Sequence, residues 1–199
     1  MARIAHQIQL RGFGLPSGPL GRLGGALMAR GNAETERRLV QLAGLHGSDT
    51  VLVLGPGPGI GLAAAAGRAG RVVGVEPSEL MLASCARRCA ELAQRGQVRL
   101  VRGDAEHTGQ PDAAMDVALS VNNVMFWPDL AAGLAEVSRV LRPGGRLLVS
   151  AHDRWLPGGA TALGIAVRAA GFTDVQTWTW QPPGNITQLA AQLRAVKPA

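Results

Sequence analysis

The chain has 199 residues, of which 47% are hydrophobic and 17% are charged. A chain this apolar cannot stay unfolded over most of its length, and its size suits a single domain. Apolar runs such as 51–54 and 62–66 are interrupted by Gly, Pro or Arg long before the ~20 residues that a bilayer demands. Two cysteines exclude a disulfide scaffold, so we expect a cytoplasmic protein.

The charge balance is basic, with 20 Lys and Arg residues against 14 Asp and Glu and a net charge of +6. Such a balance could indicate a nucleic-acid partner. The arginines are scattered, however, and adjacent pairs occur only at 37–38 and 87–88. We therefore do not expect a nucleic-acid partner.

The first 33 residues contain no acid, and four arginines fall within them. Glycines and prolines break up the apolar stretch that a secretory signal would need. We expect residues 1–19 to form a loose arm, followed by a short helix near 20–30. This basic arm could touch an anionic membrane surface.

Helical and strand-like patterns alternate along the rest of the chain. Over 33–45, Leu39, Val40, Leu42 and Ala43 share one side of a helix, with the charged residues elsewhere. Short apolar runs closed by glycine, such as 51–54, are typical of strands buried on both faces. The predicted strands are 51–54, 72–75, 98–102, 116–121, 146–151 and 173–179, with a last segment, 187–196, pairing back on 173–179. The predicted helices between them are 60–69, 78–95, 129–141 and 160–170.

This alternation predicts an α/β fold, because strand–helix–strand crossovers build a parallel sheet that is covered on both faces. We expect a Rossmann-like, doubly wound, mostly parallel seven-stranded sheet with an antiparallel C-terminal strand, plus N-terminal helices. The predicted organisation is an N-terminal arm and helices over 1–46 that cover the substrate, followed by a ligand-binding domain over 47–199.

The turn after the first strand is rich in glycine, with Gly55, Gly57, Gly59 and Gly61 separated by Pro56, Pro58 and Ile60. In open α/β sheets ligands bind beside this turn, where glycine lets them approach the backbone. The spacing fits neither a Walker phosphate loop nor G-x-G-x-x-G. Both prolines lack the backbone N–H groups that would bind a pyrophosphate. Their presence favours a ligand that does not bind this turn through phosphate groups.

Two acids follow the next two strands. Glu76 ends the second strand, where a carboxylate can accept both hydroxyls of a ribose. Asp104 ends the third strand, where its carboxylate can accept a hydrogen bond from an exocyclic amine such as that of adenine. Together with the glycine turn, these acids predict a nucleoside site at the carboxyl ends of the strands.

Five motifs occur in order: the glycine turn, Glu76, the segment 103–106, the strand 116–123 and the segment 136–149. This set resembles the class I S-adenosylmethionine-dependent methyltransferases, of the small-molecule type found in ubiquinone and menaquinone biosynthesis. The resemblance covers about residues 35–199. It implies S-adenosylmethionine as cofactor, S-adenosylhomocysteine as product and a small-molecule acceptor.

The resemblance also assigns roles to single residues. It implies that Gly55, Gly57 and Gly59 line the methionine part of the cofactor and that Glu76 binds the ribose. Around the adenine it places Pro77, Met81, Asp104 and the backbone of Ala105. The resemblance also implies that Asn122, at the end of the fourth strand, faces the methyl group and the amino group of the cofactor. The segment 141–145 is expected to stop a helix at Pro143 and turn into the fifth strand.

The sequence departs from the family at two points. The acid that often precedes the first glycine is Leu54 here, so the amino group of the cofactor must find other acceptors, such as carbonyls of the turn. The fourth strand ends in Asn122-Asn123, and the Asn/Asp-Pro-Pro-aromatic signature of base-modifying enzymes is absent. This absence argues against a nucleic-acid base as the acceptor.

Methyl transfer from a sulfonium needs an acceptor held in line, and a catalytic base is not obligatory. If a base acts, His152 and His6 are the candidates. The acceptor pocket is expected from Asn123, Phe126, Trp127 and Trp155. We expect no metal site, and we interpret Cys85 and Cys89 as buried thiols.

Two other classes of function stay open at this point. One is an NAD(P)-dependent oxidoreductase on a similar sheet, against which the two prolines and the glycine spacing argue. The other is a non-catalytic or RNA-directed protein that binds S-adenosylmethionine. The identity of the acceptor, the attacked atom and the oligomeric state stay open as well.

Overall fold

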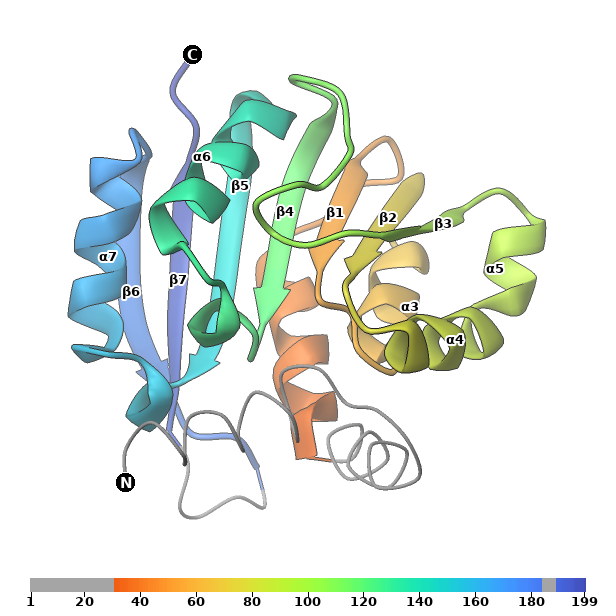
Figure 1. Cartoon of the computed structure of the whole chain (residues 1–199), viewed down its shortest axis with the longest axis horizontal. Coiled ribbons are helices and arrows are strands. Elements are labelled where there is room, and N and C mark those ends of the chain that lie inside the picture. Colours follow the sequence, from red (N-terminus) through yellow and green to blue (C-terminus); the bar gives the residue numbers. More distant parts are fainter. Residues whose placement is uncertain (1–30, 184–188) are drawn as a thin grey trace.

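The structure is a computed structural model that describes residues 31–183 and 189–199 (Figure 1). Residues 31–42 are helical. The strands are β1 (Thr50–Leu54), β2 (Arg71–Glu76), β3 (Val98–Arg102), β4 (Met115–Val121), β5 (Leu141–His152), β6 (Thr173–Trp180) and β7 (Ala190–Val196). The α-helices are α3 (Ile60–Ala66), α4 (Glu79–Arg88), α5 (Ala90–Gln94), α6 (Leu130–Val140) and α7 (Gly159–Ala169), with short 3₁₀ turns η2 (Val124–Phe126) and η3 (Asp153–Trp155).

The strands form one seven-stranded sheet in the order β3-β2-β1-β4-β5-β7-β6. The pairs from β3 to β5 are parallel, and β7 runs antiparallel between β5 and β6. The predicted doubly wound α/β sheet with an antiparallel C-terminal strand is therefore confirmed. The chain reverses direction along the sheet between β3 and β4, which brings the carboxyl ends of β1 and β4 side by side.

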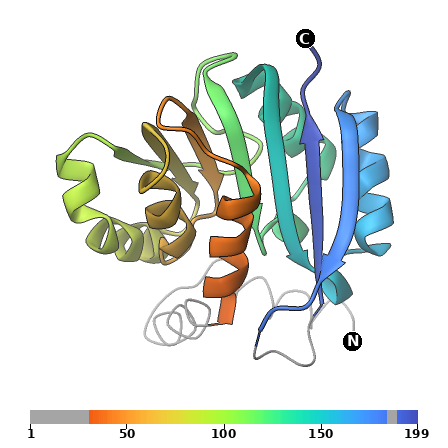
Figure 2. The ribbon, with the colours of Figure 1, turned by 180° about the vertical axis from the view of Figure 1, so that it is seen from behind.

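Helices cover both faces of the sheet (Figures 1 and 2). One hydrophobic core lies under α6 and α7, and the other lies under α3, α4 and the helix over 31–42. Successive residues of β1 alternate between these cores: Leu52 and Leu54 pack in the first, and Val51 and Val53 in the second. The unbroken apolar run of β1 follows from burial on both faces.

Two element boundaries differ from the sequence-based prediction. The helix expected over 78–95 is divided into α4 and α5 at Cys89, whose φ of −102° and ψ of 16° leave helical geometry. Strand β5 begins at Leu141, five residues before the predicted start, directly after α6 ends at Val140. The predicted turn over 141–145 is instead a bulged part of β5, where Lys197 of the chain terminus exchanges backbone hydrogen bonds with Gly144 and Gly145 at 2.9 and 2.8 Å.

Several predictions about the N-terminal region fall on residues 1–30, outside the described ranges. They are the loose arm, the short helix near 20–30, the membrane contact and the candidate base His6. Within 31–183 and 189–199, no helix is long and apolar enough to cross a membrane.

A close approach between α3 and β2 sets the position of the glycine turn. At Gly74 of β2, an added Cβ atom would lie 2.4 Å from Leu62 Cδ1 and 2.9 Å from Leu100 Cδ2. It would also lie 3.2 Å from the ring of Pro56 in the turn. Because Gly74 has no side chain, α3 and the glycine turn can pack closely against the sheet.

We expect Gly74→Ala to lower the free energy of unfolding by about 1–3 kcal/mol, because the added methyl group overpacks this contact. Urea unfolding measures the change. Gly47→Ala is the control, since an added Cβ there has no atom within 4 Å, and it should change stability by less than about 0.5 kcal/mol. Equal effects of the two substitutions would contradict the close-packing interpretation.

Candidate functional site

A cavity of about 310 Å³ opens at the carboxyl ends of β1, β2 and β4. This volume lies at the lower end of the range of small-molecule sites. Eight of the nine predicted cofactor residues line it: Gly55, Gly57, Glu76, Pro77, Met81, Asp104, Ala105 and Asn122. Three of the four predicted acceptor residues line it as well, namely Asn123, Phe126 and Trp127. The fold thus brings residues as far apart in the sequence as Gly55 and Trp127 to one edge of the sheet.

The titratable side chains of this lining are all acidic among the described residues. Among the described residues the cavity wall contains three carboxylates, Glu36, Glu76 and Asp104, and it contains no Lys, Arg or His. A phosphate-bearing ligand would meet carboxyl groups and no basic side chain there, whereas a cationic ligand would favour the ionised form of these acids and be stabilised by it. The lining therefore suits a ligand that carries positive charge.

Glu76 is 4% exposed and is held by the backbone on both sides. Its Oε2 accepts a 3.0 Å hydrogen bond from the Gly57 N–H, and its Oε1 accepts one of 3.0 Å from the Ser78 N–H. Burial raises the pKa of Glu76, and these two hydrogen bonds partly offset that effect. Each oxygen keeps a lone pair for a further donor, so the carboxylate can receive two neighbouring hydroxyl groups.

Asp104 lies at the rim of the same cavity, where its side chain is half exposed. Its Oδ1 accepts backbone hydrogen bonds from Glu106 at 3.0 Å and from His107 at 2.8 Å. Ala105, beside it, is buried. These turn contacts orient the carboxylate and leave Oδ2 without a donor from the described residues, so that it can accept one from a ligand.

The three predicted ligand glycines differ in what surrounds them, although all have positive φ. Gly57 (φ +52°) has no atom within 4 Å of an added Cβ, and it lines the cavity. At Gly55 an added Cβ would lie 2.5 Å from Asn123 Nδ2. Gly59 does not line the cavity, and its missing side chain admits Cys85 Sγ at 2.7 Å from the Cβ position. Only Gly57 leaves open space for a ligand.

Asn123 connects the ends of three segments. Its Nδ2 donates to the Leu54 carbonyl at 2.5 Å, and its Oδ1 accepts from Ser120 Oγ at 2.7 Å and from Trp127 Nε1 at 3.0 Å. The amide predicted for the acceptor pocket is therefore occupied by intramolecular bonds. Its hydrogen bonds connect the end of β1 to the end of β4 and orient the Trp127 indole.

Asn122 is unusual in two respects. It is a non-glycine residue with φ +52°, a conformation held by its backbone N–H, which donates to the Ser150 carbonyl at 2.7 Å. Both polar atoms of its buried amide lack a hydrogen-bond partner among the described residues. Leaving such groups unsatisfied costs about 1–3 kcal/mol each. A strained, unsatisfied amide in the lining of a cavity is typical of a ligand site.

An aromatic wall lies at the end of η2 and directly after it. Phe126, Trp127 and Pro128 line the cavity, and Trp127 lies against Gly133 of α6. Trp155 does not line the cavity and instead packs edge-on against Phe126, with ring centroids 6.5 Å apart.

His152 also lies outside the lining, with its ring 6.0 Å from that of Trp155. Its buried Nδ1 has no partner among the described residues, and burial, followed by the charge of Arg154, lowers its pKa. Trp155 and His152 thus form a layer behind the wall rather than part of it.

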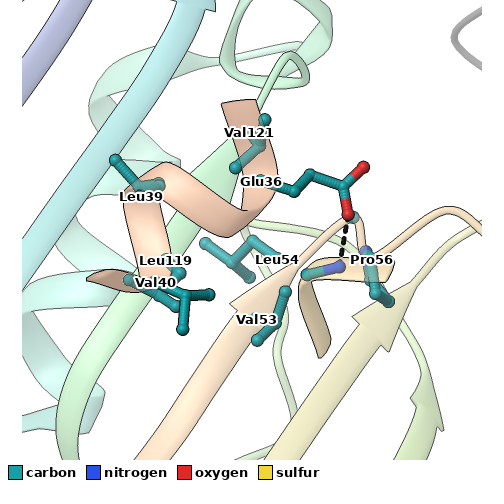
Figure 3. Close-up of a pocket in the computed structure, with 10 residues that line it drawn as sticks. Glu36, Leu39, Val40, Val53, Leu54, Pro56, Leu119 and Val121 are labelled. Atoms are coloured by element: carbon teal, nitrogen blue, oxygen red, sulfur yellow. Dashed lines mark hydrogen bonds between the residues drawn. The ribbon is translucent and has the colours of Figure 1, made fainter. Parts of the chain in front are cut away.

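Glu36, which the sequence analysis placed among the polar residues of its helix, faces the cavity. It is 9% exposed, whereas Leu42, expected on the buried side, is 37% exposed. Its Oε2 accepts the backbone N–H of Gly61 at the start of α3 (Figure 3). Burial raises the pKa of Glu36 to about 7, against the opposing effects of the Gly61 N–H, Arg88 and Arg37. Asn32, one turn earlier, lines the cavity too.

The remaining candidate groups lie apart from the cavity. Cys85 and Cys89 are buried free thiols, which confirms their interpretation from the sequence. Within the described part of the chain, no three His, Cys, Asp or Glu residues lie close enough to hold a metal ion.

Comparisons with known proteins agree with this geometry. A family model described as a methyltransferase domain matches residues 52–149. An uncharacterized methyltransferase, YdaC of Bacillus subtilis, is 30% identical over 162 residues, which cover 77% of this chain and 87% of that protein.

Solved structures share the fold at lower identity. The [4+2]-cyclase SpnF superposes with a TM-score of 0.73 at 19% identity, covering 85% of this chain and 83% of the cyclase. Phosphoethanolamine N-methyltransferase 2 of Haemonchus contortus, in complex with phosphomonomethylethanolamine and S-adenosylhomocysteine, gives 0.72 at 16% identity. This second match covers 83% of this chain and 52% of the enzyme. At these identities the structures show the fold alone.

The sheet order, the glycine turn and the acids beside it define an enzyme of the class I methyltransferase type. The chain belongs to the S-adenosylmethionine-dependent methyltransferases, and its cofactor is S-adenosylmethionine. This assignment decides against the NAD(P)-dependent oxidoreductase that the sequence had left open. The residues present fit a cationic nucleoside, because the cavity offers carboxylates, an unsatisfied amide and open space at Gly57.

The raised pKa of Glu36 predicts a pH-dependent stability. In the unfolded chain this carboxyl ionises near pH 4.5, and in the folded chain near 7, so the folded state binds its proton more tightly. The free energy of unfolding should fall as pH rises from about 4.5 and level off above about 7. Glu36→Gln keeps an acceptor for the Gly61 N–H but does not titrate. Relative to the native chain it should gain up to about 3 kcal/mol across this window.

Urea unfolding of both ligand-free proteins between pH 4.5 and 8 measures this difference. Glu34→Gln, an exposed acid on the same helix, is the control and should follow the native curve. Parallel curves for the native chain and Glu36→Gln would show that the carboxyl does not titrate in this range.

Proposed function

We propose that the enzyme transfers the methyl group of S-adenosylmethionine to an uncharged or cationic small-molecule acceptor by in-line displacement. The observation that carries the proposal is the composition of the cavity wall. It combines three carboxylates and no basic side chain, among the described residues, with a wall formed by the aromatic rings of Phe126 and Trp127 and by Pro128. Such a wall supports an apolar acceptor and disfavours a polyanion such as RNA.

In this proposal the cofactor lies along the carboxyl ends of β1, β2 and β4. Glu76 accepts the two ribose hydroxyls, and Asp104 with the backbone of Ala105 holds the adenine edge. Pro77 and Met81 pack against the adenine, and Gly57 leaves room for the methionine part, with Gly55 beside it in the lining. Asn122 supplies its unsatisfied amide toward the reacting end. Gly59 is left without a direct contact, because its space is occupied by Cys85.

When bound, the sulfonium supplies an activated methyl group. An acceptor atom held in line would take this methyl group as the carbon–sulfur bond breaks, and the electron pair of that bond would stay on sulfur. The chain contributes position and exclusion of water. Holding both reactants in line at near-attack distance is worth roughly 7–11 kcal/mol. Asn123 fixes the Trp127 indole at 3.0 Å, so the aromatic wall is preorganised for this task.

The acceptor enters, in this proposal, between the aromatic wall and the N-terminal region. Asn32 and Glu36 line the cavity from the helix over 31–42, which supports the division into a substrate-covering region, 1–46, and a catalytic domain, 47–199. Trp155 backs Phe126 and gives the wall its shape. His152 lies behind Trp155, so we assign it no contact with the reacting atoms unless an acceptor displaces that ring.

Calorimetry tests the cofactor half of the proposal. S-Adenosylmethionine and S-adenosylhomocysteine should bind and NAD should not. Glu76→Ala should weaken both by at least about tenfold, since two charge-assisted hydrogen bonds are lost. Glu79→Ala is the control, because this acid is exposed and pairs with Arg102. Methyl transfer to apolar small molecules but not to RNA would support the acceptor assignment, and the reverse preference would overturn it.

Asn122→Gly separates a ligand-binding role from a structural one. Glycine accepts the positive φ at no steric cost and removes a buried, unsatisfied amide, so the ligand-free protein should be stabilised, with a higher melting temperature. The same change should weaken S-adenosylhomocysteine binding by about tenfold, as one amide contact is lost. Thermal melting with and without ligand measures both effects. Unchanged affinity together with lower stability would assign Asn122 to the fold alone.

A further inference from the structure

The cofactor carries an α-ammonium group on its methionine part. Related enzymes often have an acid directly before the first glycine of the turn, and this chain has Leu54 at that position. Leu54 is an aliphatic side chain, 2% exposed, at the end of β1. It supplies no charge and no acceptor from its side chain. The acceptors left at this end of the cavity are backbone carbonyls of the turn and any acid that reaches in from another element.

The turn carbonyls are largely occupied. The Leu54 carbonyl accepts from Asn123 Nδ2 at 2.5 Å, and that of Pro56 accepts from the Gly59 N–H at 2.9 Å. The carbonyl of Pro58 accepts from Arg88 Nε at 2.8 Å. These carbonyls already serve as acceptors inside the fold. Each oxygen has a second lone pair and can still accept from the amino group, but a carbonyl supplies no negative charge to an ammonium.

One carboxylate from another element, that of Glu36, lies at this end of the cavity. Glu36 and Leu54 both line the large cavity and also a second cavity of about 20 Å³ beside it. Figure 3 shows that the Glu36 side chain leaves the aliphatic cluster around Leu39 and extends toward the turn near Pro56. Gly61 makes this reach possible, because an added Cβ there would lie 2.9 Å from Glu36 Oε2.

We infer that Glu36, from the N-terminal helix, is the carboxylate that receives the α-ammonium of the cofactor in place of an acid at the end of β1. The inference rests on the proposed function. The Gly61 N–H occupies Oε2, and Oε1 accepts no hydrogen bond from the described residues, so a donor can approach it. The fold thus supplies the missing charge from a segment that lies outside the glycine turn.

The burial of Glu36 in the ligand-free protein supports this assignment. No cation forms a salt bridge with it in the described residues, and its pKa is raised because it is desolvated. An ammonium group brought beside it would compensate that cost. A purely structural acid at this site would be expected to have a permanent partner for its charge.

The alternative is that Glu36 only caps the start of α3 through the Gly61 N–H. Glu36→Gln separates the two roles, because the amide oxygen can still accept that N–H while the charge is gone. The ligand panel is S-adenosylhomocysteine, its decarboxylated analogue, which keeps the amine, and 5′-methylthioadenosine, which has neither the amine nor the carboxylate. Glu34→Gln is the matched control, since Glu34 is exposed and pairs with Arg37 on the same helix.

Calorimetry at pH 8 gives the readout. We expect Glu36→Gln to weaken both amine-bearing ligands at least about tenfold and to leave 5′-methylthioadenosine within about twofold, while Glu34→Gln changes none of them. Equal losses for all three ligands, or no loss for any, would overturn the inference and leave Glu36 as a structural cap. If the native chain bound none of the three, the proposed function itself would fail.

Discussion

The turn between β1 and α3 is in contact with three other segments because its glycines lack side chains. An added Cβ would meet a neighbour at less than 3.0 Å at three of them. These neighbours are Asn123 after β4 at Gly55, Cys85 of α4 at Gly59, and Glu36 of the N-terminal helix at Gly61. Asn123 and Glu36 line the cavity, whereas Cys85 does not. Gly55 and Gly61 therefore position side chains of the cavity wall, Gly59 lets α4 pack closely, and Gly57 alone of the four opens toward a ligand.

The layered sheet could be predicted from the sequence because burial on both faces leaves a strong signal. Runs such as 51–54 have no polar residue, and they alternate with helical patterns, which restricts the topology to parallel crossovers. The boundaries of the strands and helices were harder to predict from the sequence. The early start of β5 depends on backbone hydrogen bonds that join Gly144 and Gly145 to Lys197, more than 50 residues further along the chain. No local pattern reports such a contact.

The site was predictable where a residue's position in the chain fixes its place in space. Glu76 and Asp104 follow strands of one parallel sheet, so the topology delivers them to the same edge. Glu36 is missed because the amphipathic pattern over 33–45 places the charged residues away from the apolar side of the helix. Its spacing to Leu39, Val40 and Ala43 is that of a buried helical face, which was the available signal. The occupation of the Asn123 amide depends on three partners that only the folded chain brings together.

The antiparallel insertion of β7 has a practical consequence for handling the enzyme. Val196 pairs with Arg146 near the start of β5, so the C-terminal residues lie at the end of the sheet away from the carboxyl ends of β1 and β4 (Figure 1), which line the cavity. A purification tag or a fluorophore fused after Ala199, or immobilisation through that end on a sensor surface, would keep the ligand entrance facing the solution.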